Sequence, residues 1–367
     1  MAKTLVCIVE EEMILNYLFV KELFERGDGV LLISQQRYAP IVKRFASLFP
    51  SVKVDSIILA KDGDEDLWDT ICRTIRAGVS AERRYAVNLS SGTRLMSIAV
   101  QQVFERCDSQ FYFMPIDRNV IIHSQIDDNN DNNDDEIIEI KHRVTIDEYL
   151  KINDIRCTRQ ATTQPKVFTS HFIEVFTQNL LSSRDYGVIE SLRGTKGRRV
   201  GYEQIEGLES FIKYIGFTPS HDGGLTDGEV KYLTGGWFEE YIFDAVKMMI
   251  SPNDIATGVV IQRNQNNNND INELDVVFTL NNRLFVVECK TGVGRASLYH
   301  EIVYKACALR EALLGMRSNA YIFSLNDDPK DRLKITARNL GIVYCDRTFA
   351  LQPTKMKNLF LNSKMYL

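Results

Sequence analysis

Short apolar runs alternate with amphipathic stretches through the first third of the chain. The runs predict strands, and the stretches, with apolar residues every three or four positions, predict helices. Strands that alternate with helices at this spacing form βαβ units around a mostly parallel sheet. The predicted strands are Thr4 to Val9, Val30 to Ser34, Val54 to Leu59, Arg84 to Leu89 and Phe111 to Pro115. The predicted helices are Ile14 to Phe24, Ile41 to Phe49, Leu67 to Ala77 and Leu95 to Phe104.

Beyond residue 150 the pattern of apolar positions changes twice. It first weakens into separate amphipathic stretches, which predict a helical connector over residues 151–226. It then strengthens into a long apolar helix and several short strands, so we expect an α/β domain over 227–367, after a first domain over 1–150. The helices expected here are Phe168 to Leu181, Gln204 to Ile215, Trp237 to Ile250, Glu301 to Leu314 and Arg332 to Leu340, and the strands are Val259 to Gln262, Ala320 to Phe323 and Ile342 to Cys345.

The clearest strand signal is a pair of apolar runs, Leu274 to Leu280 and Leu284 to Cys289, separated by two asparagines. β-Branched and aromatic residues on both sides of a two-residue polar break predict a hairpin. Side chains alternate along a strand, so Glu288 and Lys290 should face one side. Asp275 lies at the start of the neighbouring strand, close to where the second strand ends. The hairpin therefore predicts two carboxylates and an ammonium group at one end of a sheet.

Two carboxylates held together repel each other until a proton or a cation neutralises them. Mn²⁺ or Mg²⁺ prefers oxygen ligands and keeps several waters, so Asp275, Glu288 and the main-chain carbonyl of Cys289 are the candidate metal ligands. Lys290 would position or activate a water, or stabilise charge on a phosphate. The alternative is a solvated ion-pair face. Apolar neighbours on both strands argue against it, because buried charges are costly.

Composition limits the classes of protein that fit. The chain has 367 residues, 44% hydrophobic and 25% charged, as is usual for soluble globular proteins, and we find no run of eighteen apolar residues. Seven scattered cysteines without a CxxC pair predict reduced thiols in a cytoplasmic protein that does not bind a membrane. The net charge of −5 means that a nucleic-acid surface must be local. Candidates are the basic loop Arg193 to Arg199 and the segment from Lys330 to the last residue, with eight Lys or Arg against two Asp.

A glycine-serine loop in the first half follows a predicted strand and opens a helix. Ser90, Ser91, Gly92 and Thr93 offer small side chains and N–H groups at a helix N-terminus, where a phosphate can bind, and Arg94 could add a positive charge. The spacing is neither that of a Walker loop nor that of a dinucleotide-binding fingerprint. A plain helix cap remains an alternative interpretation of this loop.

These motifs together resemble a known family. Asp275 followed thirteen positions later by Glu288-Cys289-Lys290 has the form of the PD-(D/E)xK nuclease motif, and GGWFEEYIF looks like the helix that carries the additional acidic residue of that fold. NLSSGTRLMS after a fourth strand resembles the loop of the CARF domain, a Rossmann-like fold. The whole chain thus resembles the CARF–PD-(D/E)xK nucleases, which are CRISPR ancillary effectors activated by cyclic tetra-adenylate.

The resemblance implies a restriction-endonuclease-like C-terminal domain and a homodimer that binds cyclic tetra-adenylate across a two-fold axis. It implies a metal-dependent endonuclease that cleaves single-stranded DNA and RNA and nicks supercoiled DNA in type III CRISPR defence. The implied catalytic residues are Glu239, with Glu240 as the second choice, Asp275, Glu288 and Lys290. The implied ligand-binding residues are Glu12, Met13, Ser34, Gln35, Ser90, Ser91, Gly92, Thr93 and Arg94.

Two other functions remain open on the sequence. One is a constitutive restriction or repair DNA endonuclease whose first domain binds another nucleotide, and the other is a nucleotide-binding regulator without catalytic activity. The first loop also departs from what an anionic ligand requires. The carboxylates of Glu10, Glu11 and Glu12 would repel phosphate, so they either receive ribose hydroxyls or adenine amino groups or point away.

Overall fold

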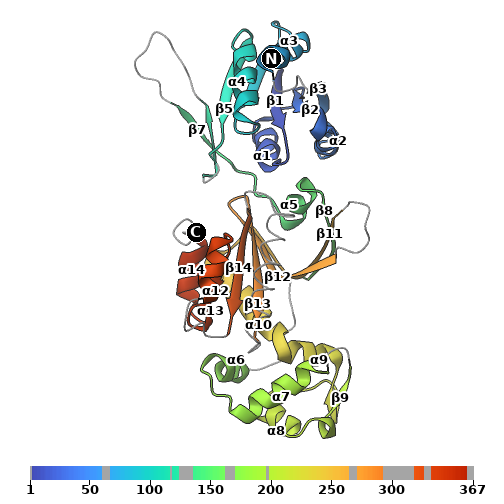
Figure 1. Cartoon of the computed structure of the whole chain (residues 1–367), viewed down its shortest axis with the longest axis vertical. Coiled ribbons are helices and arrows are strands. Elements are labelled where there is room, and N and C mark those ends of the chain that lie inside the picture. Colours follow the sequence, from blue (N-terminus) through green and yellow to red (C-terminus); the bar gives the residue numbers. More distant parts are fainter. Residues whose placement is uncertain are drawn as a thin grey trace.

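The computed structural model is an elongated molecule with three parts, in which the N-terminal domain and the helical part lie at opposite ends of the C-terminal sheet (Figure 1). The residues that the structure describes are 2–59, 67–115, 118–123, 135–161, 170–195, 198–263, 271–291, 318–325 and 332–361. The predicted helix Glu301 to Leu314 lies outside them. Among the described helices, none is long and apolar enough to cross a membrane.

The N-terminal domain is built on a sheet in the order β3-β2-β1-β4-β5-β6-β7. Its first five strands run parallel, and the last two add an antiparallel edge. These strands are β1 Lys3–Val9, β2 Gly29–Gln35, β3 Lys53–Leu59, β4 Arg84–Asn88, β5 Asp108–Phe113, β6 Val120–His123 and β7 Glu136–Glu139. The helices that follow the parallel strands are α1 Ile14–Leu23, α2 Ala39–Ser47, α3 Trp68–Ala77 and α4 Arg94–Phe104.

The central strands of this sheet read as continuous apolar runs because helices cover both faces. In β1 five successive residues, Leu5 to Val9, have no exposed surface, which is the burial expected of an inner parallel strand. All nine strands and helices predicted for the first 115 residues are present. β6 was not predicted from the sequence.

The C-terminal domain carries a mixed sheet in the order β15-β14-β13-β12-β11-β8. Its centre is the predicted hairpin, in which Asn281 and Asn282 both have positive φ, 50° and 61°, as a two-residue type I′ turn requires. The strands are β8 Ile155–Ala161, β11 Asp254–Arg263, β12 Ile271–Leu280, β13 Arg283–Lys290, β14 Ser318–Ser324 and β15 Val343–Cys345. The helices are α10 Trp237–Ile250, α12 Arg332–Asn339, α13 Arg347–Ala350 and α14 Pro353–Leu361.

The stretch predicted as a helical connector is more varied than its sequence indicated. Its first segment is β8, an edge strand that pairs with β11. Its helices are α6 Ser170–Thr177, α7 Ser183–Arg193 and α8 Leu208–Tyr214, and α9 Asp227–Lys231 follows directly after it. In space this helical part does not separate the two domains, because it lies at the far end of the C-terminal sheet from the N-terminal domain (Figure 1).

The N-terminal domain contacts the C-terminal sheet directly. Helix α5, Ile146–Ile152, buries Ile146, Tyr149 and Leu150 in one hydrophobic cluster that also contains Leu5 of the first sheet and Val277 of the hairpin. The two domains therefore share a continuous core.

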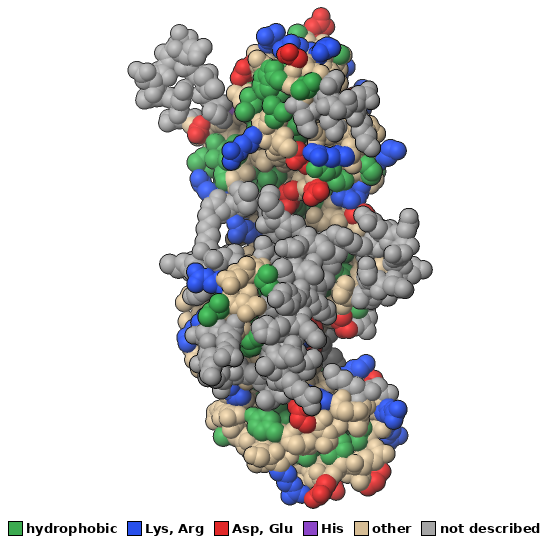
Figure 2. All heavy atoms as spheres, in the orientation of Figure 1, with side chains coloured by type: hydrophobic (Ala, Val, Ile, Leu, Met, Phe, Trp, Pro, Cys, Tyr) green, Lys and Arg blue, Asp and Glu red, His purple; other side chains and the backbone are tan. Residues whose placement is uncertain are grey.

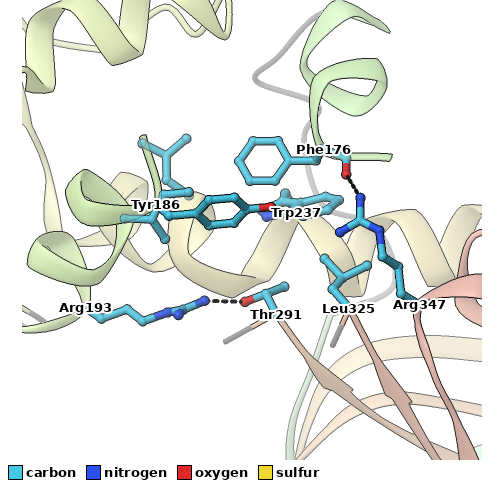
Figure 3. A pocket seen from close by; sticks show the side chains of 9 residues that line it. Phe176, Tyr186, Arg193, Trp237, Thr291, Leu325 and Arg347 are labelled. Carbon is cyan, nitrogen blue, oxygen red and sulfur yellow. Dashed lines mark hydrogen bonds between the residues drawn. The ribbon is translucent and has the colours of Figure 1, made fainter. Parts of the chain in front are cut away.

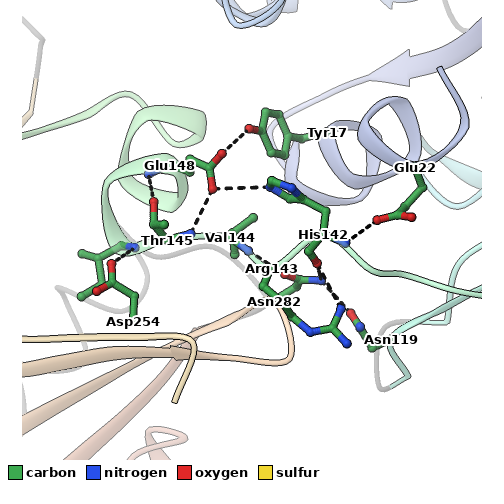
Figure 4. Close-up of polar contacts among 11 residues, drawn as sticks. Tyr17, Glu22, Asn119, His142, Arg143, Val144, Thr145, Glu148, Asp254 and Asn282 are labelled. Atoms are coloured by element: carbon green, nitrogen blue, oxygen red, sulfur yellow. Dashed lines mark hydrogen bonds and ion pairs between the residues drawn. The ribbon is translucent and has the colours of Figure 1, made fainter. Parts of the chain in front are cut away.

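A polar joint lies beside that core, at the turn of the hairpin (Figure 4). The fully buried side chain of Asn282 accepts a hydrogen bond from the N–H of Val144 at 2.9 Å. Its amide donates to Oδ1 of Asn119 at 2.7 Å and to the carbonyl of His142 at 3.0 Å. Asp254 makes a second link, because it accepts from the N–H of Ile146 at 2.9 Å.

Candidate active site and ligand-binding loops

The strand pair β12–β13 opens where the predicted catalytic residues lie. The ladder between the two strands ends at Val276 and Val287. One residue earlier on β12, the carboxylate of Asp275 accepts a hydrogen bond from the N–H of Cys289 at 2.7 Å. Asp275 thus takes the place of a main-chain partner, and its side chain lies in the gap between the strands.

Glu288 and Lys290 lie on one face of β13, as their alternation predicted. Nζ of Lys290 donates to Oε1 of Glu288 at 2.5 Å and lies 3.7 Å from Oδ2 of Asp275. Burial acts to lower the pKa of Lys290, but the charges of Asp275 and Glu288 outweigh it and hold the pKa above its usual value. Lys290 is therefore a cation that donates hydrogen bonds, which suits it better to holding a water or a phosphate oxygen than to removing a proton.

Glu239 joins this cluster from the first turn of α10. Burial, reinforced by the charges of Asp275 and Glu273, raises the pKa of the Glu239 carboxyl to about 8. Glu240, the second choice on sequence, is buried on another side of the helix, where it accepts a hydrogen bond from the hydroxyl of Tyr232. The structure therefore brings Glu239, and not Glu240, to the hairpin.

The donor set fits a divalent cation with few protein ligands. Among the described residues, the three carboxylates of Asp275, Glu288 and Glu239 lie around the ammonium group of Lys290, and burial together with the neighbouring negative charges raises the pKa of Glu239. In a strand the N–H and C=O of a residue point to the same side, so the carbonyl of Cys289, like its N–H, faces Asp275. Within the described ranges, no group of three or more His, Cys, Asp or Glu side chains is arranged to hold a metal ion. Two carboxylates, a carbonyl and waters do not need such a group.

The thiol of Cys289 belongs to the core, as predicted. It lies among buried residues that include Val287 and Phe285 on the opposite face from Glu288, and burial raises its pKa well above the usual value. A protonated, enclosed thiol is neither a nucleophile nor a metal ligand.

The predicted ligand-binding loops meet at one edge of the N-terminal sheet. β1 lies between β2 and β4, so the loops that follow these three strands are neighbours. From β1 the sheet continues to β2 and β3 on one side and to β4 and β5 on the other, so the strand order reverses between β1 and β4. Doubly wound sheets bind ligands at the carboxyl ends of the strands at such a point. Glu12, Ser90 and Thr93 are partly or fully exposed there.

Several of the predicted ligand residues are buried under these loops and hold them in place. Met13, Ser34 and Gln35 are buried, and the hydroxyl of Ser34 donates to the carbonyl of Val9 at 2.7 Å. Ser90 accepts from the N–H of Met114 at 2.6 Å. These side chains shape the loops, so any contact that Met13 makes with a ligand must come from its main chain.

The glycine-serine loop has the features of an anion site. Gly92 has φ +93°, and a Cβ there would lie 2.5 Å from Cγ2 of Ile8, so only glycine fits. The hydroxyl of Ser91 is buried and has no hydrogen-bond partner among the described residues. Thr93 caps α4 by accepting from the N–H of Met96 at 3.2 Å, and Arg94 is exposed at the first position of the helix.

Glu10 explains part of the unexpected acidity of the first loop. Its carboxylate accepts a hydrogen bond from the N–H of Thr93 at 2.9 Å and so occupies the helix N-terminus from within the protein. Sequence reasoning missed Arg37, whose guanidinium stacks 4.9 Å from the ring centre of Tyr38 and donates to Gln35 at 2.6 Å. The sequence did contain a signal for it, because Arg37 is a basic residue two positions after β2, a strand whose carboxyl end lies at the binding edge.

Two candidate nucleic-acid contacts are only partly described. Arg193, at the end of α7, points to the hairpin and donates to Thr291 at 3.0 Å, whereas Lys196 lies outside the described residues. In the basic C-terminal segment, Lys334, Lys355 and Arg338 lie on described helices.

Family models match two parts of the chain. Residues 4–149 match the Card1 CARF domain, and residues 226–359 match the Card1-like endonuclease domain. No curated protein matches the chain in sequence. The order of the two matched domains confirms the predicted fold class, a Rossmann-like CARF domain before an endonuclease domain.

Solved structures share the fold of the whole chain. Protein VC1899 from Vibrio cholerae is 18% identical, with a TM-score of 0.74 over 98% of both chains. Can2 from Sulfobacillus thermosulfidooxidans, in complex with cyclic tetra-adenylate, is 18% identical, with a TM-score of 0.71 over 98% of both chains. A type III CRISPR defence DNA nuclease activated by cyclic oligoadenylate is 14% identical, with a TM-score of 0.52 over 94% of this chain and 50% of that one.

Proposed function

The chain belongs to the family of CARF-domain endonucleases, and from this membership we propose that it is a metal-dependent nuclease activated by cyclic tetra-adenylate. The observation that carries the proposal is the cluster at the open end of the hairpin. There the carboxylates of Asp275, Glu288 and Glu239 lie around the ammonium group of Lys290. Two carboxylates and a lysine in this arrangement suit hydrolysis of a phosphodiester bond.

Each residue of the cluster has a separate task. Asp275, Glu288 and the carbonyl of Cys289 would hold Mn²⁺ or Mg²⁺, which when bound supplies Lewis-acid polarisation of the phosphate. Lys290, kept cationic by its neighbours, would donate hydrogen bonds to a phosphate oxygen and to the attacking water. Glu239, protonated near neutral pH when no cation is bound, would release its proton as the cation binds and then orient a water.

Cyclic tetra-adenylate would bind at the carboxyl edge of the N-terminal sheet. Support comes from the solved complex of Can2, from the Ser91 hydroxyl, which has no hydrogen-bond partner among the described residues, and from the positive φ of Gly92, where only glycine fits. Thr93 and Arg94 would contact phosphates after the carboxylate of Glu10 moves away, and Arg37 is a further cation beside the site.

A ring with repeated units is bound most simply by two copies of one loop set, so we propose a homodimer. Figure 2 shows hydrophobic side chains gathered over the part of the N-terminal domain where α4 and β5 lie. Ile98 and Phe113, on these two elements, are 56% and 52% exposed. Light scattering of the purified protein tests the dimer, and Ile98→Asp should weaken it if α4 forms the contact.

The proposed substrates are single-stranded DNA and RNA, with nicking of supercoiled DNA, in type III CRISPR defence. Arg193 and the basic C-terminal helices would contact the phosphates of the strand. The decisive experiment measures cleavage of all three substrates with Mn²⁺, with and without cyclic tetra-adenylate. Equal cleavage without the activator would instead indicate a constitutive nuclease. Cleavage that survives Lys290→Ala would indicate a contaminant, and no cleavage under any condition would indicate a regulator.

A further inference from the structure

Thr291 lies directly after Lys290 and connects three parts of the molecule, and Figure 3 shows its contact with Arg193. Its hydroxyl donates to the main-chain carbonyl of Thr234 at 2.7 Å. The same hydroxyl accepts a hydrogen bond from Nη2 of Arg193 at 3.0 Å. Thr234 belongs to a π-helical turn, Tyr232–Gly236, that leads into α10 three residues before Glu239. One side chain therefore joins the end of the catalytic strand, the start of the catalytic helix and the helical part of the chain.

The direction of these bonds is fixed by chemistry. A guanidinium only donates hydrogen bonds, so the hydroxyl of Thr291 must accept from Arg193, and its single proton is left for the carbonyl of Thr234. Arg193 is itself held by an ion pair with Glu190 on the same helix. The hydroxyl of Thr291 therefore has one orientation, in which it accepts one hydrogen bond and donates one.

The turn that Thr291 holds has an irregular backbone. π-Helical turns are rare and occur often at functional sites. Here the hydroxyl of Thr234 donates a hydrogen bond to the carbonyl of Val230 at 2.7 Å, and the hydroxyl of Tyr232 donates one to the carboxylate of Glu240. These two bonds stabilise the turn internally. The bond from Thr291 ties this turn to the end of the strand that carries Glu288 and Lys290, beside the packing of Tyr232 and Leu233 in one hydrophobic cluster with Val287.

We propose that Thr291 is a positioning residue for the nuclease reaction, which sets Glu239 against Glu288 and Lys290 through the carbonyl of Thr234, with Arg193 orienting its hydroxyl. The inference rests on the proposed function, since it assigns a role in that reaction. A displacement of about 1 Å in a catalytic group can cost 100-fold in rate, so a single bond at this point has a large effect. The role differs from substrate binding, because the hydroxyl is already used within the protein.

The test compares Thr291→Val, which keeps the shape and loses both bonds, with Thr291→Ser, which keeps the hydroxyl. With cyclic tetra-adenylate and Mn²⁺, Thr291→Val should lower kcat for a single-stranded DNA by about 10- to 100-fold. Its KM, and the Kd for the same DNA in EDTA, should stay within about twofold, because uniform binding is unchanged. Thr291→Ser should recover kcat to within about threefold of the parent protein. Arg193→Met should lower kcat by a smaller factor, and because Arg193 is also a proposed phosphate contact its KM should rise, unlike that of Thr291→Val.

A matched control is Thr279→Val, at the other end of the same hairpin. The hydroxyl of Thr279 is buried and makes no hydrogen bond within the described residues, so its loss should leave kcat unchanged. Hydrogen exchange at residues 232–240 gives a reading that does not depend on activity. Exchange should accelerate in Thr291→Val and not in Thr291→Ser.

Three results would overturn the inference: parent-like kcat in Thr291→Val, a serine variant as slow as the valine variant, or unchanged exchange at the turn. If the parent protein fails to cleave, the proposed function fails, and the exchange experiment still decides whether Thr291 holds the turn.

Discussion

Replacing Asn282 with Ala should destabilise the contact between the two domains, because its side chain forms three hydrogen bonds across their joint (Figure 4). A net contribution of about 1 kcal/mol for each bond gives about 3 kcal/mol in all. Alanine at φ 61° adds about 1 kcal/mol of backbone strain. We therefore expect the free energy of unfolding to fall by about 4 kcal/mol.

The neighbouring Asn281 provides the control. It has φ 50° in the same turn, but its side chain is exposed, so Asn281→Ala should cost only about 1 kcal/mol. Urea unfolding followed by circular dichroism measures both variants under one set of conditions. If Asn282→Ala lowers the free energy of unfolding no more than Asn281→Ala does, the Asn282 side chain does not stabilise the contact between the domains. Since the same hairpin carries the catalytic residues, stimulation of cleavage by cyclic tetra-adenylate should also be smaller in Asn282→Ala.

The remaining predictions concern the two sites. Gly92→Ala should weaken cyclic tetra-adenylate binding at least tenfold by calorimetry, because a strained residue at φ +93° costs about 1–3 kcal/mol and its Cβ displaces Ile8; an unchanged Kd would contradict this. Lys290→Ala should lower kcat at least about 100-fold, with the protein still folded by circular dichroism. Chelation by EDTA should abolish cleavage, and added Mn²⁺ should restore it. Because the pKa of Glu239 rises from 4.5 to about 8, the folded state keeps a proton that the unfolded state releases, so the Tm of metal-free protein should fall as pH rises across this window. Glu239→Gln should remove that part of the slope, and an equal slope in both proteins would count against the assignment.

The sequence predicted the N-terminal sheet well because its central strands are buried on both faces. Such strands appear as unbroken apolar runs, which are the strongest local signal for a strand. β8 gave no such signal, since Ile155–Ala161 alternates polar residues and owes its existence to pairing with β11, about one hundred residues later. Helix α7 was missed for another reason. Its pattern is polar, but the capping box formed by Ser182 and Asp185 was a signal that could have located its start.

The catalytic cluster was predictable to the extent that it depends on the hairpin. Alternation along β13 was enough to place Glu288 beside Lys290, and antiparallel pairing brought Asp275 near them. The choice of Glu239 over Glu240 needed the rotation of α10 about its axis, which one turn of helix cannot reveal. The contacts of Thr291 and of Glu10 could not be predicted at all, because each joins segments at least 57 residues apart.

The hairpin explains why one structural element can carry both regulation and chemistry. Its turn is held by the N-terminal domain through Asn282, and its open end presents Asp275, Glu288 and Lys290. Glu288 lies six positions after Asn282, which is about 20 Å along a strand. A strand inside a sheet resists stretching and bending, so a displacement imposed at the turn moves the open end with it. At that end Asp275 has replaced a main-chain partner, and the strands are no longer joined by their ladder. The cluster therefore lies where the hairpin is least constrained by its own pairing, so its geometry depends on contacts from outside the two strands, such as the bond from Thr291 to the turn that precedes α10.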